Sequence, residues 1–239
     1  MQEHIVSSFD RDLEGIQARI MKMGGLVEQA ILDAAEALET RDEELSDKVR
    51  RGDKVIDELD ELIHEEAARV IALRAPTAVD LRVILSVMKT SNDLERIGDL
   101  AKNMAKRNSV LMQLTQIDGA TAALRRMARA VEVMLKDALD SYIQRDAALA
   151  RDVSLRHRDV DQMYNATFRE FLTFMMEDPR NITACMHLHF IAKNLERMGD
   201  HVTSVAEQVV FLVEGAMPDE RQKGDKTSFD KSLSPEPGA

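Results

Sequence analysis

The sequence contains few of the residues that build strands and disulfides. Its 239 residues include no Trp, a single Cys and only 4% aromatic residues. Because Cys185 is alone, no intrachain disulfide can form, and a reducing, intracellular setting is expected. Strands usually draw on aromatic and β-branched residues, so the shortage of aromatics favours amphipathic helices.

Features of export, membrane insertion and common catalytic sites are also missing. No stretch approaches 18 uncharged apolar residues, so no membrane span is expected. The N-terminal MQEHIVSSFDRD carries early acidic residues and no apolar core, which is unlike a signal peptide. There is no phosphate-cradling glycine loop and no traceable Ser-His-Asp arrangement. We therefore predict that the protein is not an enzyme.

The charge balance is acidic. The formal net charge is −11, which argues against nucleic acid as the main partner, because phosphate neutralisation needs a basic face. An acidic surface fits a partner cation, a basic protein surface, or solubility alone.

Apolar residues recur at intervals of three and four along most of the chain, which predicts six long helices. Thr40-Arg41-Asp42-Glu43 is a capping-box signature at the start of the second helix. The predicted helices span about residues 8–39, 40–73, 77–108, 127–144, 146–176 and from 181 onward.

The chain repeats itself after about a hundred residues. In the first two helices the offset is 104 residues, and after the proline-containing turns it becomes 101. The matched pairs are Asp33/Asp137, Arg41/Arg145, Asp42/Asp146, Asp57/Asp161, Glu95/Glu196 and Asp99/Asp200. We predict an all-α protein of two tandem three-helix bundles, residues 1–110 and 120–216, followed by a disordered tail over 217–239.

The string LERIGD at 94–99 returns as LERMGD at 195–200, and each copy carries two acids four residues apart on one helix face. The preceding helix of each half supplies a second pair at the same spacing. Oxygen ligands suit Mg, Mn or Fe, and an imidazole makes Fe or Zn plausible. The candidate metal ligands are Asp53, Asp57, Glu95, Asp99, His157, Asp161, Glu196 and Asp200.

Helical-wheel geometry places Glu196 and Asp200 away from the apolar seam of their helix, so we expect an outward-facing cluster. Three interpretations remain open at this point: a metal-binding adaptor, a carboxylate-bridged metal oxidase or hydrolase, and a helical scaffold whose acids are simply solvated. Gly98 and Gly199 lie mid-helix, where close helix packing is the favoured explanation.

The doubled Leu-Glu-Arg-[Ile/Met]-Gly-Asp motif resembles the PhoU family of phosphate-signalling proteins. Asp80-Leu81-Arg82 after the proline turn and Gly199-Asp200-His201 match the family as well. The resemblance implies two three-helix bundles, frequent dimerisation and metal clusters held by Glu/Asp-x-x-x-Asp motifs. The sequence departs from that motif at His157, so the second metal site is expected to differ in metal preference or occupancy.

The resemblance also implies a regulatory role. PhoU-like proteins act with the phosphate ABC transporter, through its ATPase subunit, and with a phosphate-sensing histidine kinase. They restrain phosphate uptake and the starvation response when phosphate is plentiful. For this chain the expectation is a cytoplasmic homodimer that reaches the inner membrane only through its partners.

Overall fold

The computed structural model describes residues 2–114, 116–117 and 119–218, with side chains from Arg11 onward. This part of the chain is helical and contains no strand, which confirms the all-α prediction. Its elements are α1 (Gln2–Thr40), α2 (Glu43–Arg74), α3 (Ala78–Leu111), α4 (Ala120–Gln144), α5 (Ala147–Glu177), the 3-10 turn η1 (Pro179–Asn181) and α6 (Ile182–Glu214).

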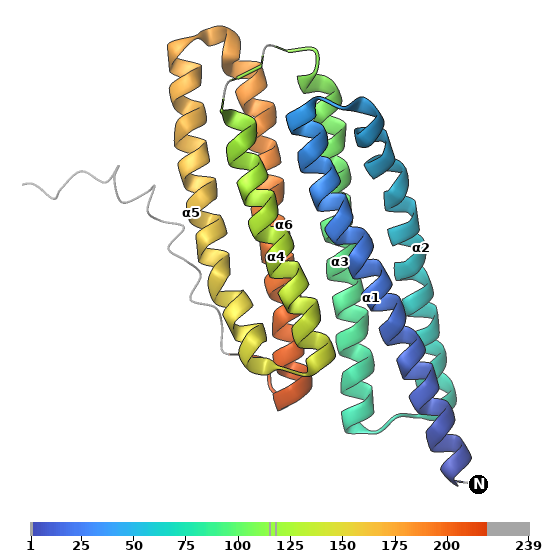
Figure 1. Cartoon of the computed structure of the whole chain (residues 1–239). Helices are drawn as coiled ribbons and strands as arrows, with labels where there is room; N and C mark the ends of the chain where they lie inside the picture. Colours follow the sequence, from blue (N-terminus) through green and yellow to red (C-terminus); the bar gives the residue numbers. More distant parts are fainter. Residues whose placement is uncertain (1, 115, 118, 219–239) are drawn as a thin grey trace, which may run out of the picture.

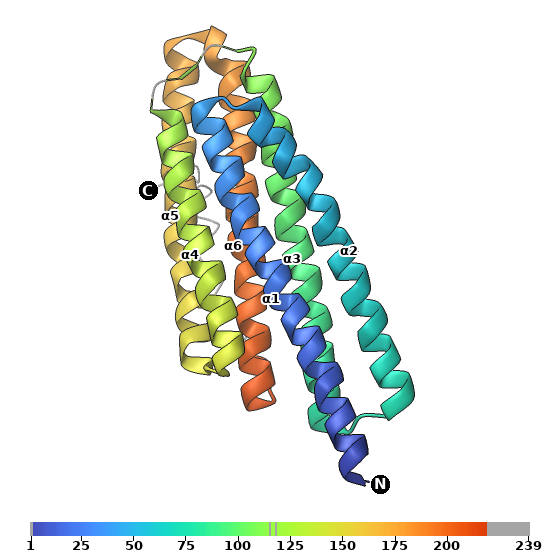
Figure 2. The same ribbon diagram turned by 45° about the vertical axis from the view of Figure 1, so that its right-hand side comes forward.

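The helices form two three-helix bundles that pack side by side. Helices α1, α2 and α3 contact one another, and so do α4, α5 and α6. The halves meet where α1 lies against α4 and α3 lies against α6, with each of these pairs running antiparallel (Figures 1 and 2). Consequently α2 and α5 flank the assembly, while α1, α3, α4 and α6 form its middle.

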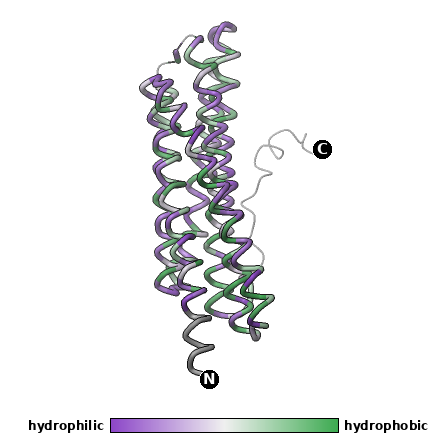
Figure 3. The backbone as a smooth tube through the Cα atoms, turned by 90° about the vertical axis from the view of Figure 1, so that its right-hand side faces the viewer, coloured by the Kyte–Doolittle hydropathy of each residue, from purple (hydrophilic) through white to green (hydrophobic). Residues whose placement is uncertain are grey.

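Hydrophilic and hydrophobic residues alternate along the helices (Figure 3), as in amphipathic helices that turn an apolar face to a core. The buried seam of α1 recurs in α4 with the offset of 104 residues, which confirms the internal duplication. The buried pairs are Ile16/Ala120, Ile20/Leu124, Met23/Met127, Val27/Val131, Ile31/Leu135, Ala34/Ala138 and Leu38/Tyr142.

Several helix boundaries differ from the prediction. Helix α1 begins at Gln2 rather than near residue 8, and α4 begins at Ala120 rather than Met127. Asp42 caps α2 by accepting a hydrogen bond from Leu45 N at 3.0 Å, whereas Thr40 still belongs to α1 and donates to Glu36 O. The predicted tail falls mostly on 219–239, outside the described residues, and the domain limits 1–110 and 120–216 stay predictions.

A buried carboxylate joins the two halves. Asp93 on α3 is only 1% exposed. Its Oδ1 lies 2.9 Å from His201 Nδ1 on α6, and its Oδ2 accepts a hydrogen bond from Ser204 Oγ at 2.6 Å. Lys89 Nζ lies 3.6 Å from the same Oδ2. The contact between α3 and α6 is therefore polar at this point as well as apolar.

Candidate functional site

The candidate ligands lie where the second and third helices of each half face each other. In the first half they come from α2 and α3, and in the second half from α5 and α6. The structure thus brings each LER[I/M]GD motif beside the candidate pair of its own half, Asp53 and Asp57 in the first and His157 and Asp161 in the second, and it keeps the two sets in separate bundles.

In the first half a lysine joins two of the acids. Lys102 Nζ on α3 donates to Asp53 Oδ2 on α2 and, at 2.7 Å, to Asp99 Oδ1. Burial alone lowers the pKa of Lys102, but the hydrogen bonds and charges of Asp53 and Asp99 outweigh it, and the net pKa is raised. The ammonium group is therefore charged at any physiological pH, and it acts as an internal counter-ion for both carboxylates.

Of the other two acids of this half, Glu95 has a longer ion pair, with its Oε2 3.4 Å from Arg96 Nε, and Asp57 makes no ion pair with a described side chain. Partial burial raises the pKa of Asp57, and the charges of Asp53, Asp99 and Glu61 raise it further against the opposing charge of Lys102. Partial burial also raises the pKa of Glu95; Asp99, Asp57 and Asp60 add to the shift, and Arg96 opposes it. This surface therefore has excess negative charge, which an added cation would relieve.

The excess charge predicts that Asp57→Asn stabilises the metal-free protein at neutral pH. Because the folded-state pKa of Asp57 is raised, its ionisation costs stability as the pH rises through that pKa. The gain at pH 7 is expected to be small and screened by solvent, roughly 0.2–0.5 kcal/mol, and to vanish below about pH 3.9. Urea unfolding at the two pH values measures it. Asp161→Asn, the repeat counterpart, is the control and should show no gain.

In the second half a histidine takes the bridging position. His157 Nδ1 on α5 lies 3.3 Å from Asp161 Oδ2, and His157 Nε2 lies 3.4 Å from Asp200 Oδ1 on α6. Thr203 stands where the first half has Lys102, and its hydroxyl donates to Gly199 O at 2.9 Å. Glu196 is paired with Lys193 Nζ at 2.6 Å.

The two mid-helix glycines permit close helix packing, as predicted. A Cβ at Gly199 would lie 3.0 Å from Cδ2 and 3.2 Å from Nε2 of His157. A Cβ at Gly98 would lie 3.1 Å from Cδ1 of Ile56. Each third helix thus approaches the second helix of its half at its glycine, and in the second half this leaves room for the bridging imidazole.

The expectation that Glu196 and Asp200 face outward is wrong for Glu196, which is 3% exposed. The reason is that α6 contacts α3, α4 and α5, so most of its circumference is covered, whereas the helical wheel considered a single apolar seam. In the first half Asp53, on α2, is also buried, at 4% exposed. Asp200 and Asp99 remain partly exposed.

The described residues hold no preformed metal site. No group of three or more His, Cys, Asp or Glu side chains with described positions is arranged to hold an ion. In the first half, Lys102 lies between Asp53 and Asp99, so that the donor set does not fit a metal in this conformation. In the second half His157 lies between Asp161 and Asp200, and each carboxylate faces a different ring nitrogen, so that these three groups do not surround one ion in this conformation either. Imidazole and carboxylate are nevertheless donor types that Fe and Zn accept.

Sequence reasoning missed Lys102, although a signal was present. Lys102 follows Asp99 by three residues, and residues three apart share a helix face.

A family model described as "PhoU domain" matches this chain twice, at residues 20–107 and 124–209. The chain belongs to the PhoU family. The two matches fall within the two bundles, so each bundle carries one PhoU domain, and the family expected from the doubled motif is confirmed.

Similar proteins extend over nearly the whole chain. Phosphate-specific transport system accessory protein PhoU homologs are 45% identical in Caulobacter vibrioides, covering 90% of this chain and 94% of theirs, and 43% identical in Rhizobium meliloti, covering 94% and 95%. The names describe accessory proteins, in agreement with the prediction that this PhoU-family chain is not an enzyme.

Two solved structures share the fold. The crystal structure of PhoU from Pseudomonas aeruginosa superposes with a TM-score of 0.84 at 38% identity, covering 87% of this chain and 100% of that one. The phosphate transport system regulatory protein PhoU from Streptococcus pneumoniae gives a TM-score of 0.81 at 28% identity, covering 89% and 100%. Both confirm the arrangement of tandem PhoU domains.

Proposed function

We propose that this chain is a cytoplasmic regulator that restrains the phosphate ABC transporter and its sensor histidine kinase when phosphate is plentiful. The observation that carries the proposal is the 45% identity, over 90% of the chain, to a protein named as an accessory of the phosphate-specific transport system. None of the helices with described residues is long and apolar enough to cross a membrane, so the proposed action relies on protein contact.

The surface supports such contact. Large apolar side chains are exposed along the end of the second half where α5 passes through η1 into α6, and exposed apolar side chains gathered in one region favour protein association. These residues are Leu172, Met176, Ile182, Met186 and Phe190. We propose that this region docks on the ATPase subunit or on the cytoplasmic part of the kinase, and that the chain acts as a homodimer.

Deleting the gene is expected to switch on the phosphate-starvation response in phosphate-replete cells, because the restraint on the kinase is lost. A starvation-responsive reporter and the initial rate of phosphate uptake measure this. Unchanged reporter activity and uptake would contradict the proposal.

A pull-down from phosphate-replete cells is expected to recover the transporter ATPase or the histidine kinase, identified by mass spectrometry. Met186→Glu is expected to weaken the capture, because it places a charge in the exposed apolar region. Asp159→Lys, on an exposed part of α5 outside that region, is the charge-changing control. If both variants capture the partner equally well, the docking surface lies elsewhere on the protein.

We also propose that the second half binds a divalent or trivalent cation, with Fe, Zn, Mn and Mg as the candidates. His157, Asp161, Glu196 and Asp200 would hold it, and the cation would neutralise the acids that now depend on His157 and Lys193. The support is the combination of imidazole and carboxylate donors on two facing helices.

Elemental analysis tests the metal site. The purified chain is expected to contain bound metal, and Glu196→Ala plus Asp200→Ala is expected to lose most of it. Glu95→Ala plus Asp99→Ala is the matched pair in the first half, where Lys102 competes with a metal, and a smaller loss is expected. If the second-half variant keeps its full metal content, the assignment is wrong.

A further inference from the structure

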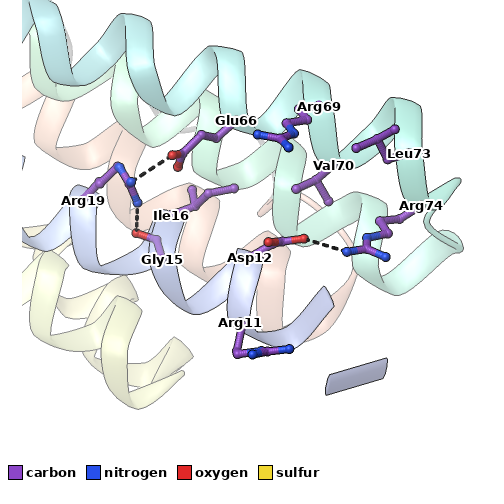
Figure 4. Close-up of a pocket in the computed structure, with 10 residues that line it drawn as sticks. All are labelled: Arg11, Asp12, Gly15, Ile16, Arg19, Glu66, Arg69, Val70, Leu73 and Arg74. Carbon is purple, nitrogen blue, oxygen red and sulfur yellow. Dashed lines mark hydrogen bonds and ion pairs between the residues drawn. The ribbon is translucent and has the colours of Figure 1, made fainter. Parts of the chain in front are cut away.

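A cavity of about 350 Å³ opens between α1 and α2, beyond the carboxylate site toward the end of α2 (Figure 4). Its volume lies at the lower end of the range of small-molecule pockets, roughly 300–1,000 Å³. Ile16 and Val70 form an apolar part of its wall, and both side chains are buried. An apolar wall displaces water and so strengthens the electrostatic interactions at the cavity.

Positive charge dominates this cavity, although the chain as a whole is acidic. Four arginines and two carboxylates line it, with Arg11, Asp12 and Arg19 on α1 and Glu66, Arg69 and Arg74 on α2. Figure 4 shows Asp12, Arg19, Glu66, Arg69 and Arg74 around the space between the two helices, with the Arg11 guanidinium on the other side of α1.

Both carboxylates are already paired. Arg19 lies 2.8 Å from Glu66 Oε1, and Arg74 lies 3.3 Å from Asp12 Oδ2. Arg69 is different: among the described side chains it has no ion-pair or hydrogen-bond partner. A guanidinium carries five N–H donors in a rigid fork, and Arg69 presents them without an internal acceptor.

The second half provides an internal comparison. With the offset of 104 residues, the apolar wall persists, because Ile16 corresponds to Ala120, which is in the core, and Val70 to Phe174, which is partly buried and packs against it. The basic residues do not persist. Arg19, Arg69 and Arg74 correspond to Ala123, Thr173 and Asp178. The basic cavity therefore belongs to the first half alone and is not a consequence of the repeated scaffold.

We propose that this cavity binds a phosphate group through Arg69, with Arg11 and Arg74 contributing positive charge. A tetrahedral dianion offers two oxygens to one guanidinium fork and further oxygens to neighbouring arginines, which a single carboxylate does not. Free inorganic phosphate and the phosphate tail of a nucleotide share this chemistry. The site stands on this cavity alone, independently of the regulatory role proposed above.

Calorimetric titration of the purified full-length chain with inorganic phosphate, and separately with ATP, tests the site at low ionic strength, where charge interactions are least screened. Saturable binding of either probe is expected. Binding of phosphate alone would indicate the free anion as the ligand, and binding of ATP alone would indicate a nucleotide. If neither probe binds at millimolar concentration, the proposal is wrong.

Arg69→Gln is expected to raise the Kd by about tenfold or more, since it removes charge-assisted hydrogen bonds. Arg69→Lys keeps the charge but loses the planar guanidinium fork, so its Kd is expected to lie between the Kd of the parent and that of Arg69→Gln. Arg51→Gln, an exposed arginine on the same helix, is the matched control and should leave the Kd unchanged. If Arg51→Gln weakens binding as much as Arg69→Gln does, the effect reflects the overall charge of the protein, and the proposal is wrong. Because Arg69 is exposed and makes no internal contact of this kind, the melting temperature of its variants should match that of the parent.

Discussion

Asp93→Ala is expected to destabilise the protein by about 3 kcal/mol, because it removes the acceptor that holds α3 to α6. The carboxylate is buried, and its loss leaves His201 Nδ1 and Ser204 Oγ without a partner at the junction. Each of these two polar groups left unsatisfied costs about 1–3 kcal/mol. Relaxation toward water near the partly exposed His201 reduces these figures. Urea unfolding followed by circular dichroism measures the loss.

The duplication supplies the control. In the second half, 101 residues later, Asn194 occupies the position of Asp93. In the first half, the residue that corresponds to His201 is Leu100. Asn194 Nδ2 makes no hydrogen bond in the structure, so that Asn194→Ala removes no partner and should change stability by only about 0.5 kcal/mol. Equal losses in the two variants would mean that the junction depends on packing at these positions and not on the Asp93 network.

A sharper form of the same test follows the two halves separately. If the network couples them, Asp93→Ala should broaden the unfolding transition or split it, because the polar link between the two three-helix units is lost while the contacts within each unit remain. A single transition that shifts without broadening would show that the apolar contacts of α1 with α4 and α3 with α6 suffice for cooperative unfolding.

The fold was predictable because it depends on local periodicity. Spacing of threes and fours placed Ile20, Met23, Val27 and Ile31 on one face of α1, and all four are buried. The periodic segment 127–144 likewise predicted the seam of α4 from Met127 onward, but it missed Ala120 and Leu124, which the structure adds to that seam. Helix ends were less predictable. Asp42 could be recognised as a cap residue, but Thr40 matched the capping pattern equally well, and hydrogen bonds that only the folded chain makes decide between them.

The sequence predicted which candidate residues share a helix face but not what surrounds them. Glu196 and Asp200 share one face of α6, but the sequence of α6 does not show that three other helices cover it, so the burial of Glu196 was missed. The link between Asp93 and His201 joins residues 108 positions apart in different halves, and no spacing rule reports such a pair. Lys102 is the exception, since its spacing from Asp99 was visible and only its reach to Asp53 on α2 required the structure.

Lys102→Met should have the second large effect. It keeps much of the side-chain volume but removes the ammonium group that neutralises Asp53 and Asp99, and it leaves the buried Asp53 carboxylate without its cation. Removing one partner of a buried pair costs about 3–5 kcal/mol, and the partial exposure of Lys102 lowers the expected loss to about 2–3 kcal/mol. The loss is measured by urea unfolding at pH 7 with a chelator present.

Lys106→Met is the matched control, because Lys106 follows one turn later on α3 and is exposed. It should change stability by only about 0.5 kcal/mol. A loss in the Lys106 variant equal to that in the Lys102 variant would show that the cost reflects overall charge and not the contact with Asp53.

Adding metal then tests whether Lys102 is a counter-ion that competes with metal or a lysine that is needed for folding alone. Without the ammonium group, Arg96 is the one cation still paired with the candidate acids of the first half among the described side chains, 3.4 Å from Glu95 Oε2 and 3.8 Å from Asp99 Oδ2, so that a solvent ion meets less competition at Asp53 and Asp57. Mn or Zn is therefore expected to restore stability to the Lys102→Met variant while changing the parent much less, and elemental analysis should show additional metal bound by the variant. If metal stabilises both proteins equally, Lys102 does not compete for the site. If metal stabilises neither, the acids of the first half are paired for folding alone, and the LERIGD motif there serves the contact between α2 and α3.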